Sequence, residues 1–197
     1  REPEPAVIHV AVTGDDASGT GEASAPFATI EKAIEIAAAG DFISVGPGDY
    51  SGNFTINKPD LTISSQQGPL STRIASAARD SVFYISPEGV GTAIDGFTVS
   101  GGTGRPSPSS YGFDYYGGAI HAQASIVVRN CVLTGNGAGT PRTDSCTFGG
   151  GIYSAGQSDD LVLVENCLLT NNFAWASGGA SFTERSTIIF DRCTVWG

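Results

Sequence analysis

A short block, Asn130-Cys131-Val132-Leu133-Thr134-Gly135-Asn136, recurs twice further along the chain. The second copy is Asn166–Asn172, 36 residues later, and the third is Arg192–Gly197, after a further 26 residues. A double glycine precedes each copy, at 117–118, 149–150 and 178–179. Self-similarity at this spacing is typical of stacked repeats, in which each unit buries its apolar face on its neighbours. Because the units are short β-branched runs between glycine-rich turns, they favour a β-solenoid over a helical array.

Length and composition are compatible with one solenoid domain. A chain of 197 residues is expected to form a single domain over 1–197, with an N-terminal cap and the first coils in 1–60 and further coils in 61–197. The 27 glycines suit a fold with a sharp corner every few residues. Charged residues make up only 15% of the sequence, against about 25% in typical proteins.

The charge balance argues against a nucleic-acid partner. The net charge is −10, and an acidic chain gains no counterion release on a phosphate backbone. No apolar run approaches the roughly 18 residues that span a bilayer, so no transmembrane segment is expected. The chain begins at Arg1 and contains no Met, which fits an exported protein without its signal peptide or a chain trimmed in another way.

One helix is expected, over 26–39. Five apolar residues recur there at helical spacing: Phe27, Ile30, Ala33, Ile34 and Ala37. Gly40 follows where a C-terminal glycine would end a helix. A single amphipathic helix ahead of a series of strands predicts a cap over the open end of the first coil. Short strands are then expected at 7–12, 42–45, 54–56, 61–64, 82–85 and 93–99.

Several segments of the chain resemble a known family. In the first half they are Pro26–Ile34, Gly40–Val45, Gly46–Tyr50, Leu61–Ile63 and Ala93–Val99. These segments are similar to the opening of right-handed parallel β-helix proteins of the pectate-lyase-like superfamily. From Gly117 onward, the glycine-glycine-aliphatic and Asn-Cys repeats resemble the β-helix repeats of polymorphic outer-membrane and adhesin-type proteins. The resemblance implies an all-β fold, a right-handed parallel β-helix (solenoid) of six to eight coils with one N-terminal capping α-helix. Since such an opening precedes lyases, epimerases, hydrolases and non-enzymes, it implies no particular activity.

Alignment of the repeats predicts which side chains face inward, because equivalent residues of parallel coils stack about 4.8 Å apart. Two rows are expected inside: Val128, Val164 and Phe190, and Cys131, Cys167 and Cys193. The three cysteines are expected to remain free core thiols, because parallel side chains on stacked strands do not easily reach the near-90° torsion of a disulfide. Cys146, in a loop, could pair or react.

Other rows are expected to face outward. One contains Arg129, Glu165 and Asp191, and predicts an ion pair between Arg129 and Glu165. Two more are mainly aliphatic: Val127, Leu163 and Ile189, and Val132, Leu168 and Thr194. Strands covered on both faces have this pattern. A folded-back loop, a further segment or another protein is therefore expected to cover this face.

Two long insertions, 101–116 and 135–148, leave the coils at neighbouring positions and are expected to fold together. Solenoids usually carry function in such insertions. Aromatic rings beside a carboxylate suit sugars, whose apolar faces stack and whose hydroxyls need acceptors. The candidate contacts to carbohydrate or a partner are Tyr111, Phe113, Tyr115, Tyr116, Tyr153 and Trp175. The alternative is that these rings cover the outward aliphatic rows.

Catalytic candidates are fewer. His121 and Tyr153 are expected to face outward at equivalent places on successive coils, with Ser181 next. The remaining candidates are Asp114, Arg142 and Asp144. The resemblance implies a lyase base of Lys or Arg with Ca²⁺ held by several Asp, but no Lys follows Lys58 and no Asp cluster shares a strand face. Hydrolysis would need two carboxylates about 5–10 Å apart, for which Asp114 could pair with Asp144 or Asp159.

Calcium is the one cofactor considered. Asp15, Asp16 and Glu22 lie in a loop rich in glycine and small polar residues, and Ca²⁺ takes oxygen ligands from such loops. Asp114 is a further candidate ligand. The alternative is that these Asp residues only stabilise turns.

The sequence leaves three functions open. The first is a secreted or cell-surface, non-catalytic module that binds a polysaccharide or surface protein through the two insertions. The second is a polysaccharide lyase or glycoside hydrolase acting on an extracellular polysaccharide. The third is a structural subunit of an oligomer or fibre, associating through the outward aliphatic rows and the C-terminal coil. We also expect either continuation of the natural protein beyond Gly197 or a second subunit at that end.

Overall fold

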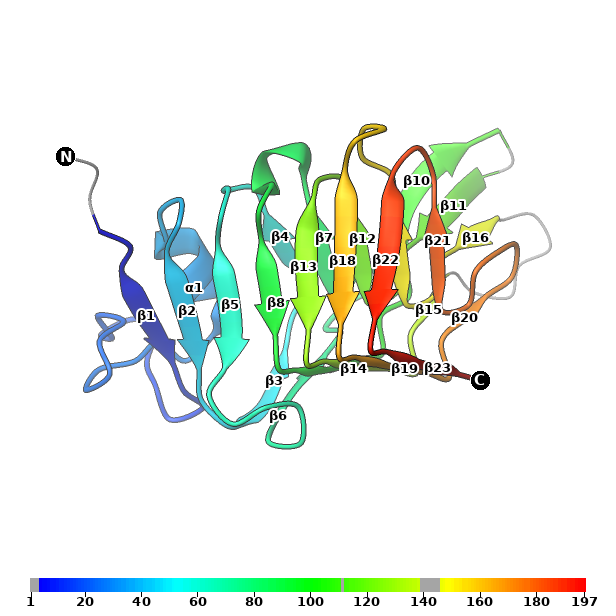
Figure 1. Cartoon of the computed structure of the whole chain (residues 1–197). Helices are drawn as coiled ribbons and strands as arrows, with labels where there is room; N and C mark the ends of the chain where they lie inside the picture. The colour runs from blue at the N-terminus through cyan, green and yellow to red at the C-terminus, as the bar shows by residue number, and fades with distance from the viewer. Residues whose placement is uncertain (1–3, 111, 139–145) are drawn as a thin grey trace.

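Three long parallel sheets form the walls of a solenoid. The computed structural model describes residues 4–110, 112–138 and 146–197, and the successive coils follow one another along a single axis from blue to red (Figure 1). The seven-stranded sheet contains β1 (Val7–Val10), β2 (Phe42–Val45), β5 (Thr62–Ser65), β8 (Ala93–Asp95), β13 (Ile126–Arg129), β18 (Leu161–Glu165) and β22 (Thr187–Asp191).

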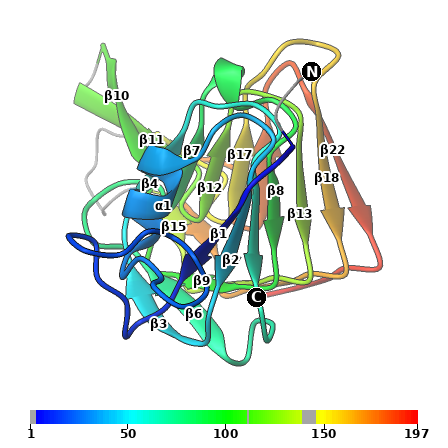
Figure 2. The ribbon, with the colours of Figure 1, turned by 90° about the vertical axis from the view of Figure 1, so that its left-hand side faces the viewer.

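Two further sheets complete each coil, as the view from the N-terminal end shows (Figure 2). The six-stranded sheet contains β3 (Gly48–Ser51), β6 (Thr72–Ala75), β9 (Thr98–Ser100), β14 (Val132–Thr134), β19 (Leu168–Thr170) and β23 (Thr194–Trp196). The five-stranded sheet contains β4 (Phe54–Ile56), β7 (Phe83–Ile85), β12 (Ile120–Ala122), β17 (Ile152–Ser154) and β21 (Ser181–Thr183). Most of the predicted strands are present, although 93–99 divides into β8 and β9 at a corner where Gly96 adopts a φ of +80°.

The capping helix is shorter than the sequence predicts. Helix α1 spans Ile30–Ile36, because Phe27 instead pairs with Val10 beside β1. Thr29 caps its N-terminus by accepting a hydrogen bond from the Lys32 amide, and Lys58 closes its C-terminus. The Lys58 ammonium donates to the carbonyl oxygens of Ile34, Glu35 and Ala37 at 2.8, 2.9 and 2.6 Å. The helix therefore ends before Gly40, and it buries Ile30, Ala33 and Ile34.

The inward rows stack as the repeat alignment predicts. Val128 pairs with Val164 and Val164 with Phe190, and the first two are fully buried. The three repeat cysteines are free thiols placed one above another, with the Cys131 amide donating to Cys167 Sγ at 3.3 Å. The Cys167 amide donates in turn to Cys193 Sγ at 3.4 Å. Burial raises the pKa of the Cys131 thiol well above its ordinary value.

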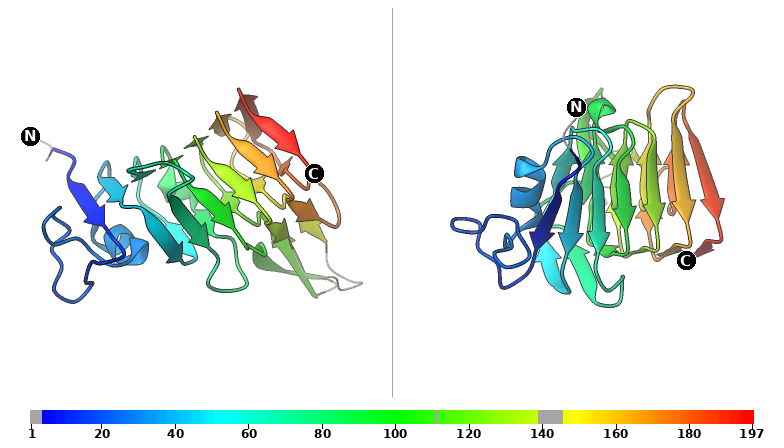
Figure 3. Two further views of the ribbon diagram at one scale, coloured as in Figure 1. Left: turned by 90° about the horizontal axis from the view of Figure 1, so that it is seen from below. Right: turned by 60° about the vertical axis from the view of Figure 1, so that its left-hand side comes forward.

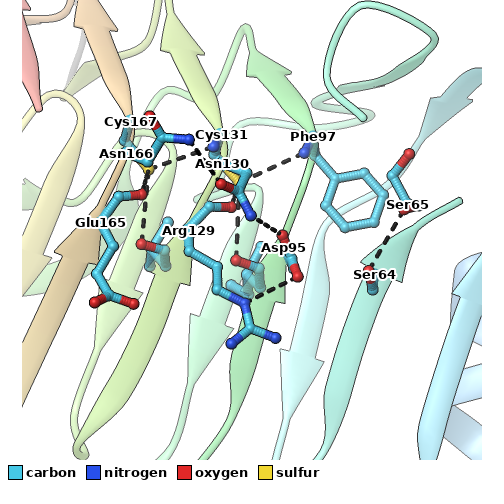
Figure 4. Close-up of polar contacts among 12 residues, drawn as sticks. Ser64, Ser65, Asp95, Phe97, Arg129, Asn130, Cys131, Glu165, Asn166 and Cys167 are labelled. Carbon is cyan, nitrogen blue, oxygen red and sulfur yellow. Dashed lines mark hydrogen bonds and ion pairs between the residues drawn. The ribbon is translucent and has the colours of Figure 1, made fainter. Parts of the chain in front are cut away.

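Two asparagines form the corners of the coils that precede Cys131 and Cys167. Asn130 and Asn166 have φ values of 54° and 50°, a left-handed conformation that Asn tolerates better than most residues. The side-chain Nδ2 of Asn166 donates to Asn130 Oδ1 at 2.8 Å, and the side-chain Nδ2 of Asn130 donates to Asp95 Oδ1 at 2.7 Å (Figure 4). This ladder fixes neighbouring coils in register.

The predicted ion pair of Arg129 with Glu165 is wrong. Arg129 lies in register with both Asp95 and Glu165, and its Nε contacts Asp95 Oδ2 at 2.9 Å (Figure 4). Asp95 is the more favourable partner because its side chain is only 19% exposed and Asn130 orients it.

The outward aliphatic rows are partly covered. Leu168 and Ile189 are 37% and 46% exposed, whereas Val127 and Leu163 are half-buried. The loop around Pro69 lies beside part of this face, where it helps to line a groove with Val132 and Leu168. Among the described residues, this loop is a covering segment for the row on the six-stranded sheet.

Candidate functional site

The two insertions fold together beside the five-stranded sheet. The first forms an antiparallel hairpin of β10 (Arg105–Ser109) and β11 (Gly112–Tyr116). The second returns as β16 (Thr147–Phe148), which pairs in parallel with Tyr115 and Tyr116 of β11. The second insertion also contains β15 (Gly137–Ala138), which pairs with β20 (Phe173–Ala174). Figure 3 gives two further views of the solenoid.

A row of aromatic side chains lies on the face of the sheet beneath this hairpin. In register across successive coils, the row contains Tyr84, His121, Tyr153 and Phe182. The prediction that Ser181 follows Tyr153 is wrong by one residue, because Ser181 pairs with Ile152. Alternation along a strand therefore turns Ser181 to the other face and brings Phe182 into the row.

His121 is enclosed by this row. Its side chain is 6% exposed, and neither ring nitrogen has a hydrogen-bond partner among the described residues. Tyr84 and Tyr153 meet the imidazole edge-on, with ring centroids at 5.2 and 4.9 Å, and Tyr116 covers it at 6.1 Å. Burial, with a smaller contribution from Arg105, lowers the pKa of His121 to about 3. The imidazole is consequently neutral at ordinary pH.

The hairpin is fixed by contacts at its base. Arg105 contacts Asp80 at 3.2 Å and stacks over the Tyr84 ring at 3.9 Å from its centroid. The Ser81 hydroxyl donates to the Tyr116 carbonyl at 3.0 Å. These contacts hold β11 over the aromatic row, so that His121 stays out of reach of a dissolved ligand.

A groove of about 430 Å³ opens next to the covered row. Its lining residues come from the hairpin, the second insertion and the last coil: Asp114, Tyr116, Cys146, Phe148, Phe182 and Glu184. Its volume falls within the usual range of small-ligand clefts. Tyr116 and Phe148 stack at 5.5 Å with ring planes 13° apart, and Phe148 meets Phe182 at 5.0 Å. The groove therefore offers ring faces and two carboxylates to one ligand.

Both carboxylates are oriented by hydrogen bonds. Asp114 Oδ1 accepts from the Cys146 amide at 2.9 Å, and Glu184 Oε2 accepts from the Tyr153 hydroxyl at 2.7 Å. Burial and the bond to Glu184 raise the pKa of Tyr153 far above its ordinary value. Burial, with the charges of Asp114 and Glu184, also raises the pKa of Tyr116.

Of the residues proposed from the sequence, the groove brings together only Asp114 and Tyr116, with Tyr153 behind them. Phe113 and Tyr115 alternate with these two and lie on the other face of β11, where Phe113 is 50% exposed. Trp175 packs edge-on against Phe173 and does not line the groove. Tyr111, Arg142 and Asp144 lie outside the described residues, and Asp159 lies in an exposed turn.

Sequence reasoning missed three residues that line the groove: Phe148, Phe182 and Glu184. A signal for two of them was present in the glycine motif. The fourth residue after Gly117, Gly149 and Gly178 is His121, Tyr153 and Phe182, respectively. Counting from the glycines would have placed Phe182 in the row and Glu184 two residues beyond it, on the same face.

The proposed calcium ligands make other contacts. Asp15 accepts from the amides of Ala17 and Ser18 within its own turn. Asp16 accepts from the amides of Ala28 and Thr29 and from the Thr29 hydroxyl, ahead of α1. Glu22 is exposed. Over the described part of the chain, no three His, Cys, Asp or Glu side chains form a group that could hold a metal ion. A calcium site here is therefore not supported.

No helix within the described residues is long and apolar enough to span a bilayer.

Sequence comparisons with known proteins give one match, over part of the chain. A family model described as "Protein of unknown function (DUF1565)" matches residues 12–66. A comparison with curated proteins finds no match in sequence.

Solved structures match almost the whole chain. A rhamnogalacturonan lyase superposes with a TM-score of 0.54 at 16% identity, covering 96% of this chain and 51% of that one. A pectin methylesterase in complex with a hexasaccharide has a TM-score of 0.54 at 13% identity, covering 100% and 66%. The pectin methylesterase from carrot has a TM-score of 0.55 at 14% identity, covering 96% and 62%. The chain thus spans about half to two thirds of these structures, and it has the right-handed parallel β-helix of the pectate-lyase-like fold.

Proposed function

We propose that this chain is an exported, extracellular or cell-surface β-helix module that binds carbohydrate without transforming it. The observation that carries the proposal is the groove beside the hairpin, where Tyr116, Phe148 and Phe182 present ring faces next to Asp114 and Glu184. Stacked rings match the apolar faces of sugars, and carboxylates accept hydrogen bonds from hydroxyls. The similar structures are named as enzymes of pectic polysaccharides, which supports a polysaccharide ligand.

The non-catalytic part of the proposal rests on the position of His121. Its ring is covered by Tyr84, Tyr116 and Tyr153, and it does not line the groove. A general base must come within hydrogen-bond reach of the proton that it removes. Under this proposal His121 supports the rings that bind the ligand.

A glycan-binding assay tests the proposal. The protein is run through gels containing different soluble polysaccharides, and retardation is measured for the wild type, Phe182→Ala and Phe113→Ala. We expect a polysaccharide that retards the wild type, with retardation falling at least fivefold in Phe182→Ala, because one stacking face is worth about 1 kcal/mol or more. Phe113→Ala removes an equally large exposed ring from the opposite face of β11, and it should leave retardation unchanged. The reverse ranking would place binding on the outer face of the hairpin.

A polysaccharide lyase or glycoside hydrolase is the second candidate. It is favoured by the two oriented carboxylates, Asp114 and Glu184, which share one groove as glycoside hydrolysis requires. The measurement is the appearance of reducing or unsaturated ends in each polysaccharide that the wild type binds. Product formation that Glu184→Gln abolishes would replace the binding proposal with this one.

Self-association is a third candidate, favoured by the last coil. Phe190 and Val195 continue rows whose preceding members are fully buried, yet they are 38% and 52% exposed. Apolar surface of this kind favours association. Light scattering at micromolar concentration should then give a mass above 20.2 kDa. A monomer at every concentration would remove this candidate.

A further inference from the structure

The groove beside the hairpin carries a specific charge pattern as well as a shape. Resting on the proposed carbohydrate-binding function, we propose that its ligand is a positively charged amino sugar. In this arrangement Asp114 and Glu184 receive the protonated amino group, and the rings of Tyr116, Phe148 and Phe182 receive the apolar face of the sugar. The proposal names a ligand class opposite in charge to a polyuronate.

The two carboxylates are placed to receive a cation. Asp114 Oδ1 is engaged by the Cys146 amide and Glu184 Oε2 by the Tyr153 hydroxyl. In the described residues the second oxygen of Glu184 has no hydrogen-bond partner, and the Tyr116 hydroxyl also interacts with the Asp114 carboxylate. These donors are neutral, so they orient each acid without neutralising its charge. An ammonium group, with three donors, can satisfy such free oxygens by charge-assisted hydrogen bonds.

Basic side chains do not cancel this charge. Every described lining residue is acidic, aromatic or Cys146. Arg105, at the base of the same hairpin, is committed to Asp80 at 3.2 Å and to the Tyr84 ring. Arg185 follows Glu184 in the chain, so at least one negative charge remains in excess at the groove.

The aromatic rings, like the carboxylates, favour a positively charged ligand. Tyr116 and Phe148 are stacked with nearly parallel planes, and Phe182 stacks on Tyr153 at 6.1 Å with planes 1° apart. The face of an aromatic ring attracts a cation and also packs on the C–H face of a sugar. A hexosamine presents both features within one residue, which a lysine side chain does not. This double match favours an amino sugar over a basic peptide.

An acidic sugar is disfavoured by the same groups. A polyuronate would bring a carboxylate at every residue against Asp114 and Glu184, and against a chain whose net charge is −10. Like charges brought together in a partly enclosed groove are costly. Under this proposal the chain shares its fold with enzymes named for pectic substrates, but its groove binds a sugar of the opposite charge.

The test compares three oligosaccharides of matched length by calorimetry: β-1,4-linked glucosamine, its N-acetylated form and galacturonate. We expect glucosamine oligomers to bind at least about tenfold more tightly than the N-acetylated form, with no binding of galacturonate. Raising the pH until the amino group loses its proton should abolish this preference. Glu184→Gln and Asp114→Asn keep side-chain size and should each reduce glucosamine affinity by about tenfold. Phe113→Ala is the matched control that should change nothing.

The outcomes separate this inference from the function on which it rests. If the N-acetylated or galacturonate oligomer binds as tightly as glucosamine, or if Glu184→Gln binds like the wild type, carbohydrate binding stands and the amino-sugar inference is wrong. If none of the three oligomers binds and no polysaccharide retards the protein, both are wrong. Binding of a lysine-rich peptide in preference to glucosamine oligomers would also overturn it. Thermal melts of each variant confirm that a loss of affinity is not a loss of folding.

Discussion

The first and last coils described in this structure differ in how their inward side chains are covered. At the N-terminal end, the backbone edge of β1 is occupied, because the His9 amide donates to the Gly21 carbonyl and Ala11 to that of Phe27. Helix α1 then covers the first coils and buries Ile30, Ala33 and Ile34. At the C-terminal end, Phe190, Val195 and Trp196 are 38%, 52% and 70% exposed. Phe190 and Val195 occupy inward positions, which are therefore buried in the earlier coils and exposed in the last one.

The difference shows where stability comes from in such a fold. A parallel coil gains its free energy from the coils on both sides, so an inward side chain stabilises the fold only where a neighbour encloses it. The N-terminal loop, Asp16 and Lys58 supply that enclosure without a further coil. The last coil has a neighbour on one side only in this structure.

The largest effect expected comes from removing one aromatic ring at each end. Phe54 lies in β4, the first strand of the five-stranded sheet, is 2% exposed and packs on Phe83 with ring centroids 5.1 Å apart. Phe54→Ala should lower the free energy of unfolding by about 3–5 kcal/mol, whereas Phe190→Ala should cost less than about 1 kcal/mol in the monomer. Urea titration followed by circular dichroism measures both. Equal losses would contradict the contrast between a closed and an open end.

The second prediction concerns His121, the member of the aromatic row that lies under the hairpin. Because the folded pKa of His121 is lowered to about 3, folding gains from its neutral form above the ordinary pKa near 6.5. Below that value the unfolded chain binds one more proton, so stability falls as the pH drops towards 3. Between pH 7 and pH 4.5 the loss should be roughly 2–3 kcal/mol.

Denaturant titrations at the two pH values test this, with His121→Phe as the comparison. That variant cannot titrate at this position, so its loss of stability between pH 7 and 4.5 should be smaller than that of the wild type. A loss as large as the wild type's would show that other groups cause the acid sensitivity.

The third prediction concerns the loop that closes the N-terminal end. Asp16 accepts three hydrogen bonds that fix the start of α1. Although burial works to raise its pKa, the hydrogen bonds from Thr29 and Ala28 and the charge of Lys32 lower it on balance. Asp16→Ala should cost about 1–3 kcal/mol in thermal or urea unfolding. Asp15→Ala, which affects only an exposed turn, is the matched control and should cost less.

The contribution of Asp16 has a defined pH window. A lowered folded pKa means that its contribution is complete above the ordinary Asp value and is lost as the pH falls through the folded value. The difference in stability between wild type and Asp16→Ala should therefore shrink only in strongly acidic solution. A difference that already shrinks near neutral pH would rule out the Asp16 carboxylate as its cause.

The smallest effect expected is kinetic, in the reaction of thiols with a disulfide reagent. Cys146 is exposed, whereas Cys131 and Cys167 are buried and Cys193 is half-buried near the open end. We expect Cys146 to react first, Cys193 next, and the other two only at the rate of unfolding. Mass spectrometry of quenched samples gives this order. Early labelling of Cys131 would mean that the closed part of the solenoid opens readily.

Much of the fold could be predicted because stacking turns periodic sequence into periodic structure. The Asn-Cys block defines a corner and an inward thiol in every copy, so its repetition specifies the register of β13, β18 and β22. The helix bounds were less accurate, because Phe27 fits both a helical pattern and a β-bridge to Val10. Asp16 lies outside the helical pattern, but it accepts hydrogen bonds from Ala28 and Thr29 and so fixes the helix start after Phe27.

The site was less predictable because it depends on contacts between insertions. Alternation along β11 places Asp114 and Tyr116 together and turns Tyr115 away, but this follows only once the hairpin register is known. Arg129 illustrates the same limit, since two carboxylates flank it in the stack, and Asp95 is favoured by its burial and by its hydrogen bond from Asn130. Local sequence patterns predict which side chains stack in a row across the coils. Whether such a row is covered depends on insertions that are distant in the sequence.

The last asparagine of the first repeated block also affects how the protein ages chemically. The sequence contains one Asn-Gly step, Asn136-Gly137, the dipeptide in which asparagine cyclises and deamidates most readily. Asn136 is 1% exposed. Its side-chain Nδ2 donates to the carbonyl oxygen of Val99 at 3.0 Å, and its Oδ1 accepts from the backbone N–H of Gly102 at 3.1 Å. With its side chain held and water excluded, the ring closure cannot proceed in the folded coil. Accumulation of isoaspartate at this position during storage would therefore record how often the middle coils come apart.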